Sequence, residues 1–240
     1  MKTKLFVTLF FTMFVGIVCA QDNLQLLIEG MHCGGCAGRV KKALTEVNGV
    51  SNISVDLEKK VVSMDYNSSE VSTDQIKAAI TAVAEKFKPA DYDPNQVLER
   101  TIAYRAGQMN CGGCAGKVKK NIGAEAGVIS VEANPETKEV SIKYDANKVT
   151  AAELKDDFKK FGYTVSRYWA NEVVKYATFK TENITNVDEL STNLKKQDGI
   201  LDVNVNAETK VVEIAYHSGK VTVEALSESF KPLSLTLAAN

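Results

Sequence analysis

The strongest constraint on how this chain folds is an internal repeat. A shift of 78 residues superposes 31–66 on 109–144 without a gap, and 17 of the 36 positions are identical. The identities include the cysteine motif (33–36 and 111–114), a Gly-Val pair (49–50 and 127–128), Tyr66 and Tyr144. A match of this length at one fixed spacing indicates a single structural unit that is used twice.

A third, weaker copy follows the first two. A further shift of 72 residues places 199–216 on 127–144 with nine identical positions. In this register Asn183-Ile184-Thr185-Asn186 aligns with Cys111-Gly112-Gly113-Cys114. We therefore expect a degenerate third unit in which carboxamides replace both thiols.

Hydrophobic periodicity gives the same order of elements in each unit. An alternating strand leads into the cysteine loop, an amphipathic helix with an i, i+4 apolar stripe ends at a glycine, and two alternating strands follow. A second helix and a short last strand complete the unit. The expected core residues of the first strands are Leu24, Leu26 and Ile28; Ile102, Tyr104 and Ala106; and Val174, Tyr176 and Thr178. The second helices are expected to start near Ser72, Thr150 and Thr222.

This order of strands and helices predicts an α+β fold of three tandem ferredoxin-like βαββαβ sandwiches, with both helices of each unit on one face of its sheet. The expected divisions are a signal peptide at 1–20, a first unit at 21–92, a linker at 93–100, a second unit at 101–169 and the degenerate third unit at 170–240. The last strand of the first unit should be short or missing, because 87–92 has a poor strand sequence.

The amino terminus has the pattern of a secretory signal peptide. Lys2 and Lys4 precede an apolar run over 5–18, and small residues up to Ala20 provide a cleavage site. The run is shorter than the roughly 20 residues that a membrane-spanning helix needs. We expect export to the periplasm or beyond, with no stable membrane span after cleavage. A lipid anchor at Cys19 is the disfavoured alternative, because Val18 stands where such sites carry a small residue.

Composition and charge argue against a nucleic-acid partner. The chain has 29 basic and 30 acidic residues, a formal charge of −1, and loss of Lys2 and Lys4 on cleavage takes it to −3. Hydrophobic residues make up 45% and charged residues 25%, as in globular proteins. The mature chain is therefore expected to be soluble.

Cys33, Cys36, Cys111 and Cys114 remain after cleavage, in two pairs of identical spacing. Two thiols three residues apart, on a loop that enters a helix, can converge on one soft ion, and the helix amino terminus favours the thiolate form. Paired cysteines in an exported protein are also read as disulfides, and redox centres place the same spacing at a helix start. These alternatives remain open at this point.

Gly30-Met31-His32-Cys33-Gly34-Gly35-Cys36 and Gln108-Met109-Asn110-Cys111-Gly112-Gly113-Cys114 resemble the loop of the heavy-metal-associated domain. That family includes copper chaperones, the amino-terminal domains of metal-pumping ATPases and the periplasmic mercury-binding protein. The resemblance implies binding and transfer of a thiophilic ion by the four cysteines, with a metal-transporting ATPase or another metal acceptor as partner.

The resemblance also suggests roles for the neighbours of the cysteines. Met31 and Met109 should pack inward beneath the loop, and Tyr163 occupies the position of an aromatic or lysine that approaches the metal loop. The first unit has Ala84-Glu85 in that register. His32 would at most assist as an extra ligand.

Two sulfur ligands suit a near-linear Cu(I) or Hg(II) ion, whereas structural zinc takes four ligands, and no carboxylate flanks either motif. We therefore favour Cu(I), with Hg(II) or Zn(II) behind it. The predicted function is non-enzymatic sequestration or transfer of Cu(I), with no catalytic residues. The alternatives are a thiol-disulfide oxidoreductase and an adaptor module whose cysteine sites are vestigial.

Overall fold

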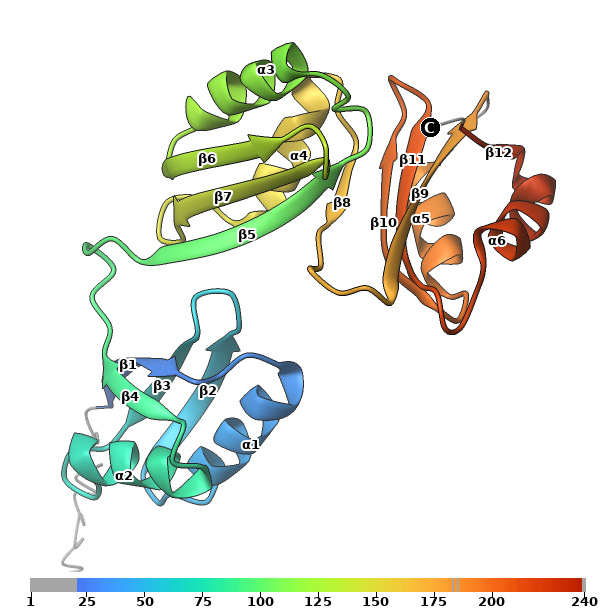
Figure 1. Ribbon diagram of the computed structural model, residues 1–240. Helices are drawn as coiled ribbons and strands as arrows, with labels where there is room; N and C mark the ends of the chain where they lie inside the picture. The colour runs from blue at the N-terminus through green and yellow to red at the C-terminus, as the bar shows by residue number, and fades with distance from the viewer. Residues whose placement is uncertain (1–20, 183, 185, 239–240) are drawn as a thin grey trace, which may run out of the picture. The chain divides into compact units, whose positions relative to one another are not determined.

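The computed structural model describes residues 21–182, 184 and 186–238, so the predicted signal peptide lies outside the described residues. The described chain forms three four-stranded antiparallel sheets, each with two main helices (Figure 1). The predicted fold class is therefore confirmed. The chain divides into two compact units at Tyr92 and Asp93, and each unit is described by itself.

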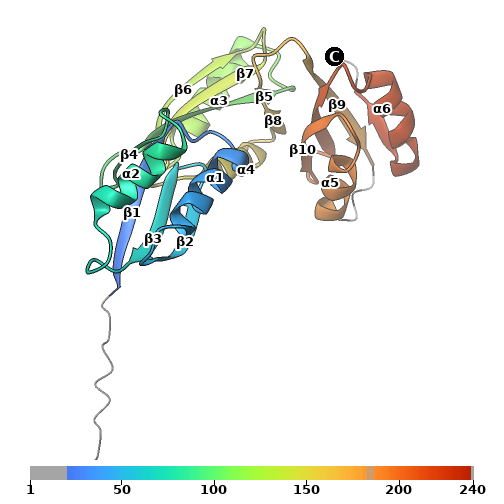
Figure 2. The same cartoon turned by 90° about the horizontal axis from the view of Figure 1, so that it is seen from below.

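The first unit holds repeat 1. Its elements are β1 (Asp22–Glu29), α1 (Gly34–Thr45), β2 (Val50–Asp56), β3 (Val61–Tyr66), α2 (Thr73–Val83) and β4 (Lys88–Asp91). The strand order is β2-β3-β1-β4, and Figure 2 shows α1 and α2 on the same face of the sheet. The two helices and that face enclose a core that includes Leu26, Ile28 and Val40.

The last strand of repeat 1 is present and short, which is the first of the two outcomes that its sequence predicted. β4 has four residues and pairs with β1, with Pro89 opposite Ile28. It is an edge strand, where proline is tolerated because one side of the backbone needs no partner. Phe87, fully buried just before β4, attaches the segment to the core.

The second unit contains repeats 2 and 3. Repeat 2 comprises β5 (Glu99–Ala106), α3 (Gly112–Gly123), β6 (Val128–Asn134), β7 (Glu139–Asp145), α4 (Ala151–Lys160) and β8 (Val165–Arg167), in the strand order β6-β7-β5-β8. Repeat 3 comprises β9 (Val174–Thr181), α5 (Val187–Lys195), β10 (Ile200–Asn206), β11 (Val211–His217), α6 (Val223–Phe230), a short 3-10 helix η1 (Lys231–Leu233) and β12 (Leu235–Leu237), in the order β10-β11-β9-β12. β5 begins at Glu99, inside the segment predicted as a linker.

Local signals in the sequence set the helix boundaries. Ser72, Thr150 and Thr222 cap α2, α4 and α6, as predicted, and each side chain accepts a hydrogen bond from a backbone N–H of the first turn. The glycines predicted to end the first helices lie just beyond them with positive φ: Gly49, Gly127 and Gly199. In this conformation a residue without a side chain avoids strain.

The first strand of repeat 3 presents a different face from the one predicted. Ala177 and Phe179 point into the core and pair with Ile214 and Val212, whereas Tyr176 and Thr178 lie on the opposite face. The cause is a shorter first helix, since α5 has 9 residues and α3 has 12. An ungapped alignment that fits the end of the helix therefore displaces the strand before it by three residues.

Repeat 3 packs its open sheet face against repeat 2 within the second unit. All six residues of β11 from Val211 to Tyr216 are at most 6% exposed, so both faces of this strand are covered. β8 contacts β10 and β11 (Figure 1). The Asn204 side chain donates to the Val165 carbonyl at 2.7 Å, and Lys155 pairs with Asp202 at 2.8 Å. Over the described part of the chain, no helix combines the length and apolar character that crossing a membrane requires.

Candidate metal centre

The first cysteine loop joins β1 to α1. Cys33 caps α1, and its sulfur accepts a hydrogen bond from the Cys36 backbone N–H at 3.3 Å. The two sulfur atoms lie 2.9 Å apart, with Cys33 exposed and Cys36 buried. Gly30 begins the loop at φ +87°, where an added Cβ would lie 2.1 Å from the Lys86 carbonyl oxygen. Glycine at this position therefore lets the loop approach the backbone that leads into β4.

The surroundings of the first loop favour a thiolate. The pKa of Cys36 is lowered to about 7 from its ordinary value of 9.0, and a hydrogen bond from the Cys33 thiol makes the largest contribution. A backbone hydrogen bond at His32, the guanidinium of Arg39 and the charge of Lys86 act in the same direction, while burial opposes them. Arg39 and Lys86 place nitrogen atoms 3.9 and 3.8 Å from the Cys36 sulfur. These groups together favour the thiolate form of Cys36.

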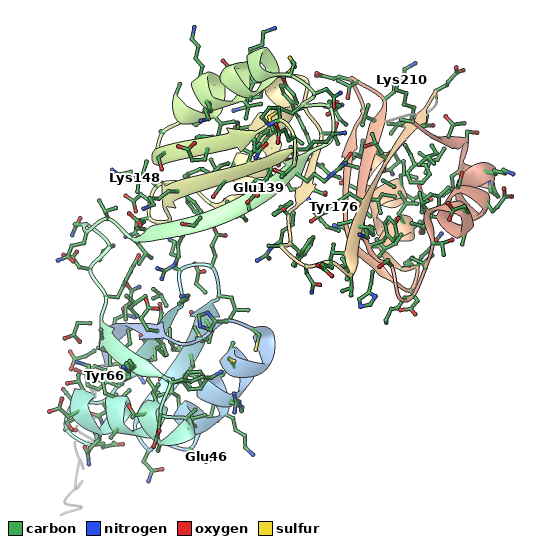
Figure 3. The ribbon with its side chains drawn as sticks, in the orientation of Figure 1. Glu46, Tyr66, Glu139, Lys148, Tyr176 and Lys210 are labelled. Carbon is green, nitrogen blue, oxygen red and sulfur yellow. A yellow bond between two sulfur atoms is a disulfide. The ribbon has the colours of Figure 1, made fainter. Side chains whose placement is uncertain are left out.

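The second loop repeats this backbone arrangement between β5 and α3. Cys111 caps α3, and its sulfur accepts from the Cys114 backbone N–H at 3.1 Å. The two cysteines are joined by a disulfide, with Cα atoms 5.1 Å apart (Figure 3). Each loop therefore brings its two sulfurs close enough to share one bond or one ion.

The loops differ in the group that approaches them from the end of each repeat. In repeat 2 the Tyr163 hydroxyl donates to the Cys114 carbonyl at 3.4 Å, so Tyr163 does approach the loop as the resemblance implied. In repeat 1 it is Lys86 that approaches, not Ala84 or Glu85. The sheet pairings place Pro89 in register with Val165, because the segment from the cap of α2 to β4 is two residues longer than its counterpart from the cap of α4 to β8. The ungapped comparison cannot show this insertion, which places Phe87 and not Glu85 in register with Tyr163, with Lys86 directly before it.

Met31 and Met109 are completely buried. Met31 belongs to the core of repeat 1, and Ile184 packs against the core of repeat 3 two residues before its helix cap, as Met31 does in repeat 1. Core packing is therefore the role that the structure gives to this position. His32 is exposed beside Cys33, and within the described residues no group of three or more His, Cys, Asp or Glu side chains is placed to hold one metal ion.

The third repeat retains the cap without the thiols. Asn186 caps α5, and its carbonyl oxygen accepts from the backbone N–H groups of Asp188 and Glu189, each at 3.1 Å. Asn186 thus occupies the place of Cys111, and Glu189, three residues later, occupies that of Cys114. The sequence alignment had assigned these two places to Asn183 and Asn186, and Asn183 lies outside the described residues.

The fold and the sites define a small βαββαβ domain with a Cys-x-x-Cys loop at its first helix. The model of the Heavy-metal-associated domain matches residues 25–87 and 103–164, together more than half of the chain. The chain therefore belongs to the heavy-metal-associated domain family.

Several proteins are similar to this chain. The copper chaperone CopZ of Staphylococcus haemolyticus is 43% identical over 24% of this chain and 85% of its own length. A copper-exporting P-type ATPase of Bacillus subtilis is 25% identical over 60% of this chain, but the match spans only 17% of the ATPase. The solved amino-terminal soluble domains of Bacillus subtilis CopA are 22% identical, cover 65% of this chain and 99% of their own, and have a TM-score of 0.29.

Proposed function

We propose that this chain is an exported, non-enzymatic protein that binds Cu(I) at two Cys-Gly-Gly-Cys sites and holds it or passes it to an acceptor. The observation that carries the proposal is the first loop, where two sulfurs lie 2.9 Å apart and the pKa of Cys36 is lowered to about 7. Soft thiolates select Cu(I), Hg(II) or Zn(II) over hard cations, and two ligands suit Cu(I) better than zinc.

The unequal exposure of the two thiols suits transfer by ligand exchange. Exposed Cys33 is accessible to an ion on a donor, while buried Cys36 supplies a thiol whose pKa is lowered. In each exchange one protein thiolate forms a bond to Cu(I), one donor ligand leaves, and the thiol proton passes to solvent. Similarity to a copper chaperone and to copper ATPases supports an acceptor that is a metal-transporting ATPase or another thiol-bearing protein.

The second site needs reduction before it can bind metal. Cys111 and Cys114 are joined, and a disulfide offers no thiolate until two electrons and two protons convert it to the dithiol. The same disulfide supports the second candidate function, thiol-disulfide exchange. An oxidoreductase would reduce a test disulfide catalytically without metal, whereas a metal carrier would show stoichiometric binding and no turnover.

Metal analysis tests the leading function. The chain 21–240 is purified and reduced anaerobically, then titrated with Cu(I) against a chelator of moderate affinity. We expect two bound ions in the parent chain, one each in C33S/C36S and C111S/C114S, and none in the quadruple variant. Retention of zinc in equal amounts with loss of Cu(I) to the chelator would contradict the copper assignment.

Export is tested separately. Expression of the full gene with its first 20 residues should yield a mature chain that begins at Gln21 outside the cytoplasm. Mass spectrometry of the released protein checks both the cleavage point and the absence of a lipid on Cys19. Retention of the full-length chain inside the cell would contradict this part of the proposal.

A further inference from the structure

A buried acidic side chain connects repeat 3 to repeat 2. Glu213, on β11, has no exposed side-chain surface, and it pairs with Arg105 on β5, whose side chain is 12% exposed. The Thr178 hydroxyl donates to the other carboxylate oxygen at 2.6 Å. Arg105 also lies over the ring of Tyr176, with the guanidinium carbon 5.0 Å from the ring centre (Tyr176 is labelled in Figure 3). A buried charge pair of this kind holds its two surfaces in one arrangement.

Three departures from the common repeat sequence meet at this contact. Glu213 replaces the serine found at the same position of repeats 1 and 2, and Arg105 stands where repeat 1 has Leu27. Gly107 stands where repeat 1 has Glu29, which pairs with Lys60 at 3.2 Å. All three differences lie at the contact between repeats 2 and 3: two of them form the ion pair, and the glycine leaves space beside it.

The absence of a side chain at Gly107 leaves room for the side chains of Glu213 and Thr178. A Cβ at Gly107 would lie 2.8 Å from both a Glu213 carboxylate oxygen and the Thr178 hydroxyl, closer than real Cβ contacts occur. Repeat 2 thus has no side chain at Gly107, where the Glu213 side chain of repeat 3 packs. No such demand acts on Glu29 in repeat 1, whose side chain is half exposed.

This contact lies at the base of the second cysteine loop. Gly107 follows β5 and precedes Cys111 by four residues. The loop closes on itself through the Met109 N–H, which donates to the Ala106 carbonyl at 2.9 Å. On the other side the Gln108 side chain accepts from the Thr164 N–H at 2.8 Å. Repeat 3 therefore touches the residue from which the loop starts.

From these observations we infer that the third repeat is a positioning domain for the second cysteine loop, and that Glu213 is its positioning residue. Having lost its own thiols, repeat 3 contributes an acid that occupies the space beside Gly107, pairs with Arg105 and fixes the start of the loop. The inference rests on the second loop being the functional site proposed above. The test of this inference measures amide hydrogen exchange and thiol alkylation, and neither measurement requires metal binding.

The test uses the full chain 21–240 after reduction, with the first loop as an internal reference. Glu213→Ser restores the residue of the other repeats. We expect exchange of the Ala106 and Met109 amides to accelerate roughly tenfold or more, because loss of a buried partner leaves Arg105 unpaired. The alkylation rate of Cys111 should change with it, while Cys33 keeps its rate.

Two further variants separate positioning from simple stability. Glu213→Gln keeps the volume and one acceptor oxygen but replaces the other oxygen by an amide nitrogen and removes the charge, so exchange and alkylation should lie between those of the parent chain and those of Glu213→Ser. Glu29→Ser breaks the exposed pair at the matching place in repeat 1 and should leave the first loop unchanged. Exchange of the α5 and α6 amides shows in the same measurement whether repeat 3 remains folded.

If Glu213→Ser unfolds the unit, the double variant R105L/E213S replaces it, because it leaves no buried unpaired charge. Unchanged exchange at Ala106 and Met109 in a folded serine or double variant would overturn the inference. Equal acceleration in both cysteine loops would also overturn it, since repeat 3 would then act on general stability alone.

Discussion

The two cysteine loops share a backbone and differ in what surrounds it. Cys33 and Cys111 have nearly the same torsion angles, φ −152° and ψ 160° against φ −149° and ψ 158°, and each precedes a helix of 12 residues. Yet the first loop faces the cations of Arg39 and Lys86, whereas the second has a tyrosine hydroxyl on a backbone carbonyl. The motif thus sets the position of the sulfurs, and residues outside it set their charge environment.

The loops also differ in their covalent state and in their connection to the rest of the chain. Cys33 and Cys36 are free thiols, whereas Cys111 and Cys114 form a disulfide. Only in the second loop does a neighbouring repeat within its compact unit insert an acid, Glu213, at the base. Identical motifs in tandem therefore need not be equivalent sites.

The largest effect we expect is a loss of stability when the buried methionine that precedes each cysteine pair is truncated. Met31→Ala or Met109→Ala removes a fully buried side chain, and each should lower the free energy of unfolding of its own repeat by about 2–5 kcal/mol. Denaturant unfolding followed by repeat-resolved hydrogen exchange measures the loss. His32→Ala and Asn110→Ala, at exposed neighbours, serve as matched controls with little expected change. A methionine variant that kept its stability but lost Cu(I) affinity would make that methionine a ligand instead.

These features show what the sequence could predict. Helix starts at Ser72, Thr150 and Thr222 and the burial of the two methionines depend on local patterns, and these predictions are confirmed. The register of β9 was wrong because a deletion within the first helix of repeat 3 displaces the preceding strand. An ungapped comparison has no means of locating such a deletion.

Hydrophobic periodicity could not predict the contacts between repeats. Arg105 and Glu213 are 108 residues apart, and their pairing depends on which sheet face repeat 3 presents to repeat 2. One signal was present: glutamate replaces serine at a position where the other two repeats agree. The contact of this glutamate with Thr178 could not be identified from the alternation pattern, because the misplaced register of β9 put Thr178 in the core.

A pH series sharpens the difference between the loops, because only the second depends on Glu213. Burial raises the pKa of Glu213 to about 7 from its ordinary value of 4.5, although Arg105, Thr178 and Lys138 act to lower it. The folded unit therefore keeps this proton to higher pH than the unfolded chain does. Its stability should fall as pH rises from about 4.5 to about 7 and then level off, by an amount on the order of a few kcal/mol.

Denaturant midpoints of the full chain across this range measure the effect. Glu213→Gln provides the control, since an amide does not titrate and its pH dependence should lack this component. The first unit should show no corresponding change between the two chains. An identical fall in the parent chain and the glutamine variant would assign the pH dependence to other groups.

A smaller effect separates the degenerate cap from the cysteine caps. Asn186→Ala removes the acceptor for the Asp188 and Glu189 N–H groups and should destabilise repeat 3 by about 1 kcal/mol. Cys33→Ser should change the stability of repeat 1 less, because a serine oxygen can also accept from the helix N–H groups. Thermal unfolding of each variant checks the ranking, and a larger loss for the serine variant would contradict a shared capping role.

The smallest change we expect concerns the cations that distinguish the first loop. Lys86→Met removes the charge near Cys36 and should raise the pKa of that thiol, but only modestly, because Lys86 is exposed and screened by solvent. Ultraviolet absorbance of the thiolate, followed against pH, measures the shift, with Lys88→Met as the control from the neighbouring strand. Tyr163→Phe should leave the reduced second loop unchanged, because its hydroxyl donates to a carbonyl and not to sulfur. If the tyrosine variant shifted its thiols as much as the lysine variant does, the contrast between the two environments would not hold.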